Sequence, residues 1–144
     1  MSAFMDSPFK SISILYRKSH IWLNNGCAQY DLTAAQAVVI LIVCDFEELT
    51  QDEITKRLGL DKSVIAKTVT KLEETGFIVR TTNVKDKRTY VIQPTARAWD
   101  VYLFVKGQID LCFQRMTQQM TGAERAEFKR LLLLAAETTI AQEE

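Results

Sequence analysis

Apolar residues recur at helical spacing along most of this chain, and only residues 77–92 switch to the alternation that is typical of strands. A long first helix is predicted from about Pro8 to Gln29, because Ser7 is a good cap and proline suits a first helical turn. One face of it can carry the apolar side chains of Phe9, Ile12, Tyr16, Leu23 and Cys27. Its other sides carry Ile14, Leu15, Ile21 and Trp22. We therefore expect this helix to pack against two partners.

A second predicted helix is apolar on all of its sides. Thr33 and Gln36 form a capping box at its start, in which each side chain bonds the backbone N–H of the other residue. The run AVVILIVC at 37–44 is rich in β-branched residues and is also compatible with a strand. The capping box favours a helix, which must then be buried. Residues 45–49 are interpreted as a polar link.

A short helix, a tight turn and a longer helix come next. A capping box of Thr50 and Glu53 starts the short helix, and Gly59 permits the turn at low steric cost. Asp61 is placed to cap the longer helix, and Gly76 is its natural stop. On a helical wheel, the inward face of the longer helix carries Ile65, Val69 and Leu72. Its outward face carries Ser63, Ala66, Lys67, Thr70 and Glu74.

Two alternating stretches, 77–82 and 89–92, are predicted to pair as a β-hairpin around a charged loop at 83–88. Helix, turn, helix and hairpin are, in that order, the parts of a winged helix-turn-helix. Such a unit places its second helix in the major groove of DNA and the hairpin beside it.

Two more helices are predicted after the hairpin. The first begins at Pro94 and runs to about Gln119, with Gly107 as a weak point. Its apolar side chains are Trp99, Tyr102, Leu103, Ile109, Phe113 and Met116. The second begins at a capping box of Thr121 and Glu124 and carries Phe128 and the four leucines 131–134.

The terminal helices supply more apolar surface than one compact core can cover. The predicted fold is therefore mainly α with a small β-hairpin wing, a winged helix-turn-helix whose N- and C-terminal helices form a dimerisation region. We assign residues 1–32 to an N-terminal dimerisation helix, 33–93 to a DNA-binding lobe and 94–144 to C-terminal dimerisation helices. All three belong to one intertwined domain, for which 144 residues are sufficient.

Composition excludes several classes of protein. No apolar stretch is long enough to span a membrane and the first residues lack a signal-peptide pattern, so we expect a cytoplasmic protein without a membrane partner. Cys27, Cys44 and Cys112 form no CxxC pair, and His20 is the only histidine, so no metal site is expected. Because the chain also lacks a glycine-rich phosphate loop and a nucleophile motif, the sequence indicates neither an enzyme nor a cofactor.

Charge is distributed unevenly along a chain whose net charge is +0. Residues 56–88 hold nine basic and four acidic side chains, a local charge of +5 that the remaining residues balance with −5. A basic segment on an acidic body is typical of a protein that binds nucleic acid in one orientation. Chance clustering on a solvated surface is the alternative, and a winged-helix module that binds only proteins is the alternative function.

Candidate DNA contacts follow from the outward face of the longer helix. Serine and threonine hydroxyls can bond base edges, and lysines beside them can reach phosphates. The hairpin loop adds an exposed basic tip that suits the minor groove. The candidate DNA-binding residues are Lys62, Ser63, Lys67, Thr70, Lys71, Lys85, Lys87 and Arg88. Asp86 is predicted to pair with a nearby arginine and to fix the shape of the loop.

These segments resemble the MarR family of bacterial transcription regulators. The matching pieces are Leu32-Thr33 with Gln36, Leu49-Thr50-Gln51, Leu58-Gly59-Leu60-Asp61, Leu72-Glu73-Glu74-Thr75-Gly76-Phe77-Ile78 and Asp86-Lys87-Arg88. The resemblance implies an obligate homodimer in which the first and the last two helices intertwine. It also implies a recognition helix that starts at Asp61 and a wing that carries Lys87 and Arg88 toward the minor groove. Residues 92–97 depart from the family pattern, which has a Leu-Thr pair and a later glycine.

The resemblance further implies a small aromatic or lipophilic effector bound between the dimer helices and the DNA-binding lobe. A ligand-responsive repressor on pseudo-palindromic sites is the function expected from it. The candidate pocket residues are Tyr16, His20, Trp22 and Tyr30, although core packing explains them equally well. Cysteine sensors in the family lie near the start of the first helix, where this chain has Phe9, so its three cysteines are interpreted as packing residues.

Overall fold

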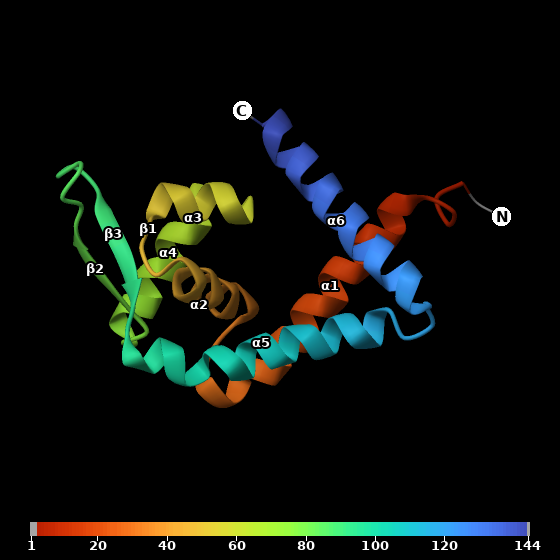
Figure 1. Cartoon of the computed structure of the whole chain (residues 1–144), viewed down its shortest axis with the longest axis horizontal. Helices are drawn as coiled ribbons and strands as arrows, with labels where there is room; N and C mark the ends of the chain where they lie inside the picture. Colours follow the sequence, from red (N-terminus) through yellow and green to blue (C-terminus); the bar gives the residue numbers. More distant parts are fainter. Residues whose placement is uncertain (1–2, 144) are drawn as a thin grey trace.

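Six α-helices and a three-stranded sheet make up residues 3–143, the part of the chain that this computed structural model describes (Figure 1). In chain order the elements are α1 (Pro8–Cys27), the 3₁₀ turn η1 (Ala28–Tyr30), α2 (Ala34–Phe46), β1 (Leu49–Thr50), α3 (Gln51–Leu58), α4 (Lys62–Glu74), β2 (Ile78–Thr82), β3 (Tyr90–Pro94), α5 (Ala96–Met116) and α6 (Gly122–Gln142). The mainly helical, winged fold that the sequence predicts is confirmed.

The core of the lobe lies where α2 meets α4, α5 and the sheet. Segment 37–44 is helical, so the competing strand interpretation is wrong. Both bonds of the capping box between Thr33 and Gln36 are present at the start of α2. Because α2 is apolar on all sides, it can contact α1, α4, α5 and β3 at once and fill the centre of the lobe.

The sheet has one strand more than the predicted hairpin. Its order is β1-β3-β2, with Leu49 opposite Ile92 and Thr50 opposite Val91. Segment 45–49 is therefore not a simple polar link, because α2 continues to Phe46 and Leu49 is a buried strand residue. A strand of two residues is too short to show alternation in the sequence.

Pro94 ends β3, and the prediction that it begins the following helix is wrong. It lies opposite Ile78, next to a position where the Thr95 N–H donates to the Phe77 carbonyl at 3.1 Å. The Ile78–Pro94 pair thus falls between hydrogen-bonded positions, so the missing proline N–H costs no ladder bond. Helix α5 begins two residues later and passes through Gly107 without a break.

The helix caps follow the sequence with two exceptions. The capping box of Thr121 and Glu124 is complete. At Thr50 it is half formed: the hydroxyl accepts from the Glu53 N–H, but the Glu53 carboxylate accepts from that hydroxyl instead of a backbone amide. Asp61 occupies the N-cap position of α4, yet its side chain makes no capping hydrogen bond.

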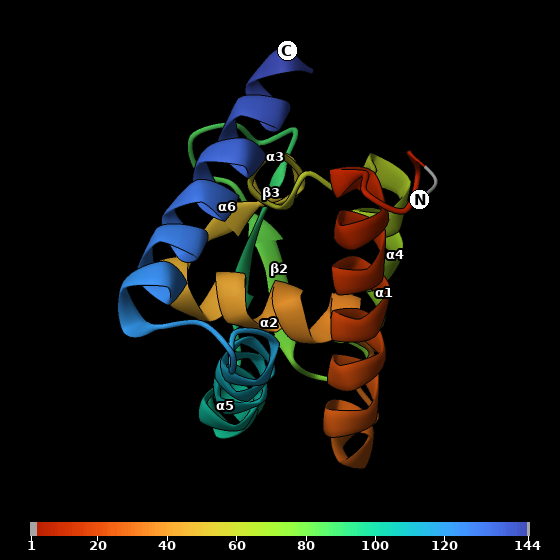
Figure 2. The same cartoon turned by 90° about the vertical axis from the view of Figure 1, so that its right-hand side faces the viewer.

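The terminal helices α1, α5 and α6 extend away from the lobe (Figure 1), and we call them the stem. In Figure 2, α1 and α6 stand apart on opposite sides of the view. Helices α1 and α5 pack together, and the Trp22 Nε1 donates to the Gln108 carbonyl between them at 3.1 Å. Helix α6 turns back and brings Ile140 to a hollow beside Gly59, at the turn between α3 and α4. No described residue of α6 is buried, and Phe9 near the start of α1 is 69% exposed. The stem therefore leaves a large apolar surface uncovered.

Within residues 3–143, no single helix has both the length and the apolar character needed to cross a membrane. The segment of α1 and η1 passes that test only together with α2, to which it is bent by 77°.

Candidate nucleic-acid interface

Helix α4 has the two faces that the helical wheel predicts. Ile65, Val69 and Leu72 are fully buried in the core. The opposite side is open to solvent, and one shallow hollow on it is lined by Ala66, Lys67, Thr70, Lys71 and Glu74. Ser63 is exposed at the start of the same helix. The structure therefore brings five of the candidate DNA-binding side chains, Lys62, Ser63, Lys67, Thr70 and Lys71, onto one exposed helix.

Two adjacent backbone hydrogen bonds end α4 and orient the wing. The Phe77 N–H donates to the Leu72 carbonyl at 2.9 Å, and the Gly76 N–H donates to the Glu73 carbonyl at 3.2 Å. This is a Schellman motif, which requires the left-handed backbone that Gly76 adopts at φ +84°. The chain leaves the motif directly into β2, so the direction of the wing depends on how α4 ends.

The wing tip is fixed by an arginine–aspartate pair. The Asp86 carboxylate accepts from Arg88 Nε at 3.0 Å and from Nη2 at 3.2 Å, and also from the Arg88 backbone N–H at 3.1 Å. The hydrogen bonds from Arg88 hold the pKa of Asp86 below its usual range. Asp86 thus pairs with a nearby arginine, and its role in shaping the wing stays a prediction. Val84 at the tip is 92% exposed and touches little of the protein.

Removing the Asp86 carboxylate tests this pairing. A carboxylate whose pKa is lowered stays ionised at neutral pH, so the pair persists until the pH falls through that lowered value. Asp86→Asn frees Arg88 and removes one negative charge beside phosphate. We expect tighter binding to random duplex DNA, with a salt slope steeper by about one, and a lower ratio of specific to random affinity. Fluorescence anisotropy at several salt concentrations measures both quantities.

Asp100→Asn is the matched control, because it makes the same change of charge at an exposed position of α5. Equal effects of the two substitutions would show that net charge, and not the held arginine, accounts for the result.

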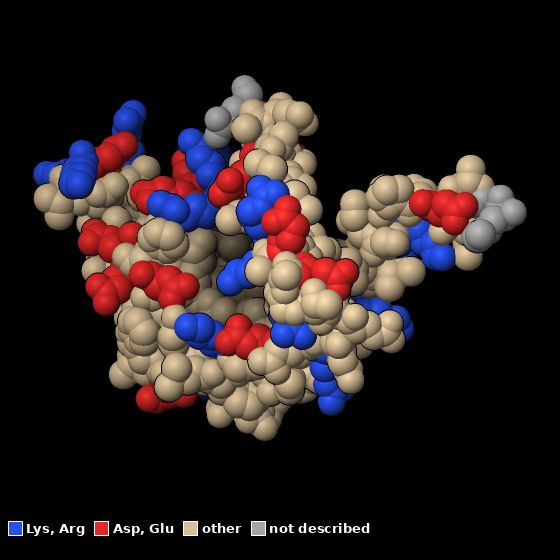
Figure 3. All heavy atoms as spheres, turned by 45° about the vertical axis from the view of Figure 1, so that its right-hand side comes forward, with Lys and Arg blue, Asp and Glu red and all other residues tan. Residues whose placement is uncertain are grey.

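Ion pairs occupy some of the basic side chains of segment 56–88. Arg80 binds Glu73 at 3.0 Å and lowers the pKa of that carboxyl, and Lys62 lies 3.9 Å from Asp52. Within residues 3–143, no ion pair involves Lys67, Lys71, Lys85 or Lys87. Figure 3 shows basic side chains gathered at the tip of the wing with an acidic one among them. Lys56 and Arg57 of α3 likewise form no ion pair with a described residue. The unpaired basic side chains of this segment therefore lie on α3, on the outer face of α4 and at the wing tip.

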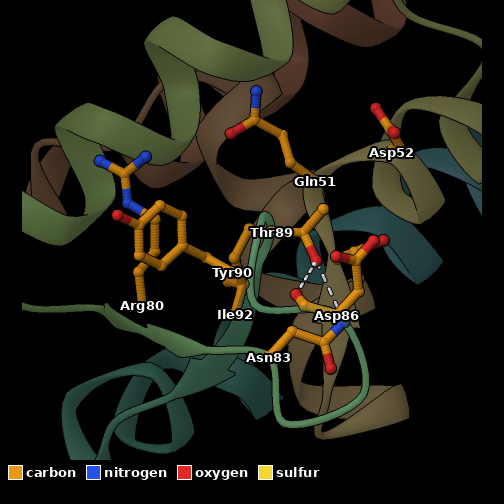
Figure 4. A pocket seen from close by; sticks show the side chains of 9 residues that line it. Gln51, Asp52, Arg80, Asn83, Asp86, Thr89, Tyr90 and Ile92 are labelled. Carbon is orange, nitrogen blue, oxygen red and sulfur yellow. Dashed lines mark hydrogen bonds between the residues drawn. The ribbon is translucent and has the colours of Figure 1, made fainter.

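A hollow of about 350 Å³, lined mostly by residues with polar side chains, lies between the wing and the start of α3 (Figure 4). Tyr90 and Arg80 reach into it from the wing strands, and Gln51 reaches into it from α3. Tyr90 is 58% exposed although it lies on the same face of β3 as the buried Ile92. The hydrophobic core does not extend as far along β3 as Tyr90. Tyr90 and Gln51 are not among the candidate residues that the sequence indicates, since no signal in the sequence marks where the core ends.

The four candidate effector residues do not lie in one place. His20 and Trp22 line an apolar hollow of about 260 Å³ between α1, α2 and α5, together with Cys112 and Met116. Tyr16 lies one turn from His20, with ring centroids 4.2 Å apart. Tyr30 is outside this hollow and packs edge-on against Phe104, with ring centroids 5.0 Å apart. The structure thus gives His20 and Trp22 a shared hollow and places Tyr30 among core-packing residues.

The three cysteines have thiols of low acidity. Burial raises the pKa of Cys44 to about 11, with a smaller contribution from the neighbouring Asp45. Burial also raises the pKa of Cys27 and of Cys112. Because the thiolate is the reactive form, these environments favour packing roles over rapid oxidation.

Comparisons with known proteins agree with this geometry. Residues 30–89 match the sequence model of the MarR family. An uncharacterised HTH-type transcriptional regulator of Bacillus cereus is 34% identical over 64 residues, which span 44% of each chain. The chain therefore matches less than half the length of this curated relative. The matched family segment runs from the end of η1 through α2 and the helix-turn-helix to the loop of the wing.

Two solved structures extend the likeness to the stem helices. A crystal structure of MarR superposes with a TM-score of 0.85 at 26% identity and covers 99% of this chain and 97% of that one. A MarR family regulator of Listeria monocytogenes, complexed with 26mer DNA, superposes with a TM-score of 0.89 at 17% identity and covers 94% and 91%. At that identity the second likeness supports the fold alone.

Proposed function

Because this chain belongs to the MarR family, whose members are transcriptional regulators and not enzymes, we propose that it binds double-stranded DNA sequence-specifically and regulates transcription. The observation that carries the proposal is the outer face of α4, where Ser63 and Thr70 stand near Lys67 and Lys71, two lysines that form no ion pair within residues 3–143. Hydroxyls on an exposed helix can contact base edges in the major groove. The lysines of α4 and the wing supply phosphate contacts. A regulator of this kind acts where the chromosome is, which in bacteria is the cytoplasm.

A homodimer is part of the proposal. Helices α1 and α6 expose many large apolar side chains, among them Phe9, Ile12 and the four leucines 131–134, as expected of a surface that a second copy covers. A twofold dimer through this surface carries two copies of α4, which can read two half-sites roughly 34 Å apart. Pseudo-palindromic operators follow from that symmetry.

A ligand-responsive repressor is the finer form of the proposal. The hollow beside His20 and Trp22 is apolar and lies where α1 and α5 join the lobe, which suits a small aromatic or lipophilic molecule. The two recognition helices can stand at more than one separation in such a dimer. A ligand with a higher affinity for one of these conformations than for the other would change the free energy of DNA binding by about 1–3 kcal/mol. Repression follows if the unliganded dimer has the operator spacing.

Substitutions on α4 and the wing distinguish residues that contact base edges from residues that contact phosphates. Duplexes are first selected from a randomised pool with the wild-type protein, and their affinities are compared with random duplex. Ser63→Ala and Thr70→Ala are expected to relax sequence preference, while Lys87→Ala weakens binding to both kinds of duplex and lowers the salt slope by about one.

The competing function, a protein-interaction module, predicts no retention of the wild type on duplex DNA at moderate salt. Equal losses on selected and random duplexes for all three variants would contradict the assigned roles even if DNA binding itself is found.

A further inference from the structure

The end of recognition helix α4 and the start of stem helix α5 are joined by side chains of α5. The Thr95 hydroxyl donates to the Gly76 carbonyl at 2.6 Å, and the Arg97 Nη1 donates to the Thr75 carbonyl at 2.5 Å. The Arg97 guanidinium also lies 4.4 Å from the centre of the Phe77 ring. We call Thr95 and Arg97, with the groups they hold, the α4–α5 joint.

The two carbonyls that the joint binds are not used by the backbone hydrogen bonds that end α4. The Schellman motif uses the carbonyls of Leu72 and Glu73, but it does not use those of Thr75 and Gly76. Carbonyls at a helix C-terminus carry partial negative charge, so a guanidinium is a favourable partner for them. Arg97 therefore meets a complementary charge and a flat aromatic surface at the same point.

Thr95 makes its bond to α4 at the expense of its own helix. It occupies the N-cap position of α5, where a threonine hydroxyl usually accepts from a backbone N–H of the first turn. Here the side chain makes no capping hydrogen bond and donates to Gly76 instead. The Thr95 hydroxyl thus bonds the end of α4 instead of capping its own helix. This indicates that the joint fixes the angle between α4 and α5.

We propose that Arg97, with Thr95, is a positioning residue that sets the angle between α4 and α5 and thereby the half-site spacing that the dimer accepts. The proposal rests on the proposed function, because a spacing exists only for a dimer that binds duplex DNA. Helix α5 belongs to the stem, and α4 carries the base-reading face, so any rotation at the joint moves one recognition helix relative to the other. Phe77 is 2% exposed, so the ring beneath Arg97 is itself held by the core.

Operators of altered spacing test the joint. A selected duplex is remade with its spacer one base pair shorter or longer, which changes the half-site separation by about 3.4 Å and the rotation by roughly a tenth of a turn. The wild type is expected to lose about tenfold or more in affinity for either change, within the range usual for coupled sites. Arg97→Met is expected to bind all three spacers within about threefold, because its recognition helices are no longer held at one angle.

Conservative variants separate positioning from direct DNA contact. Arg97→Lys keeps the charge but loses the planar group that lies on Phe77, so it should resemble Arg97→Met in its spacer preference. Thr95→Val removes the bond to Gly76 and should also flatten the preference, whereas Thr95→Ser restores it. If Arg97 instead contacted phosphate, Arg97→Lys would behave as wild type. Arg97→Met would then lower the salt slope by about one and leave the spacer preference unchanged. That result would overturn the proposal.

A measurement without DNA keeps the two proposals distinguishable. A nitroxide on Glu74→Cys, in a Cys112→Ala background, reports the distance between the two copies of α4, since Cys27 and Cys44 are buried and do not label. Arg97→Met is expected to broaden or shift this distance while far-UV circular dichroism and the dimeric state stay unchanged. An unaltered distance distribution overturns the joint, whereas a wild type that binds no duplex overturns the proposed function.

Discussion

Leu132→Glu in α6 is expected to convert the proposed dimer to a monomer and to lower affinity for a two-site duplex by about 10²- to 10⁴-fold. Leu132 is 43% exposed in the single chain and lies on the same side of α6 as Phe128 and Ala136, one turn away in each direction. A carboxylate there would lose its water when the partner covers α6. Because each half-site alone binds weakly, loss of the second contact removes most of the affinity. Sedimentation equilibrium and anisotropy measure the two effects.

Thr138→Glu is the matched control for that substitution. It adds the same charge to an exposed residue on a different side of α6 from Leu132, near Glu127 and Leu134 on a helical wheel. Helix α6 buries no described residue in its own chain, so neither substitution should unfold the lobe, and circular dichroism checks this. A Leu132→Glu protein that stays dimeric would show that another surface makes the dimer.

Lys67→Glu on α4 is expected to lower affinity for selected and random duplexes alike by about 10²-fold or more. Lys67 lies on the open face of α4, and no ion pair involves it within residues 3–143. The substitution removes one proposed phosphate contact and would place a negative charge against the DNA backbone, where like charges repel strongly. The salt slope should fall by about one, and thermal unfolding should change little because the side chain is exposed.

Lys106→Glu carries the same change of net charge on an exposed residue of α5 and serves as the control. It is expected to alter DNA affinity only slightly, since it acts through the long-range field of the protein. If Lys106→Glu and Lys67→Glu reduce binding equally, net charge and not the position on α4 governs affinity.

The sequence predicted the local parts of the lobe well because local rules decide them. The inward face of α4 follows from helical periodicity, and the caps at Thr33 and Thr121 follow from residue types three positions apart. The Asp86–Arg88 pair is also local, because the two residues stand two positions apart in a short loop.

The features that the sequence did not predict depend on contacts between distant segments. β1 exists because Leu49 meets Ile92, and Pro94 belongs to β3 because its partner across the sheet is Ile78. The contact of Tyr30 with Phe104 likewise depends on how α5 packs beside the end of α1. No sequence pattern marks Arg97 as a residue that contacts α4, because its partner is the backbone carbonyl of Thr75, 22 residues away.

Hydroxyl-radical footprinting of the wild-type protein on a selected duplex tests the central claim most directly. A twofold dimer with α4 in the major groove and the wing beside it predicts two protected segments related by twofold symmetry, with centres roughly one helical turn, or 34 Å, apart. A single short protected segment, or no protection on a duplex at moderate salt, would contradict a dimeric reader of DNA.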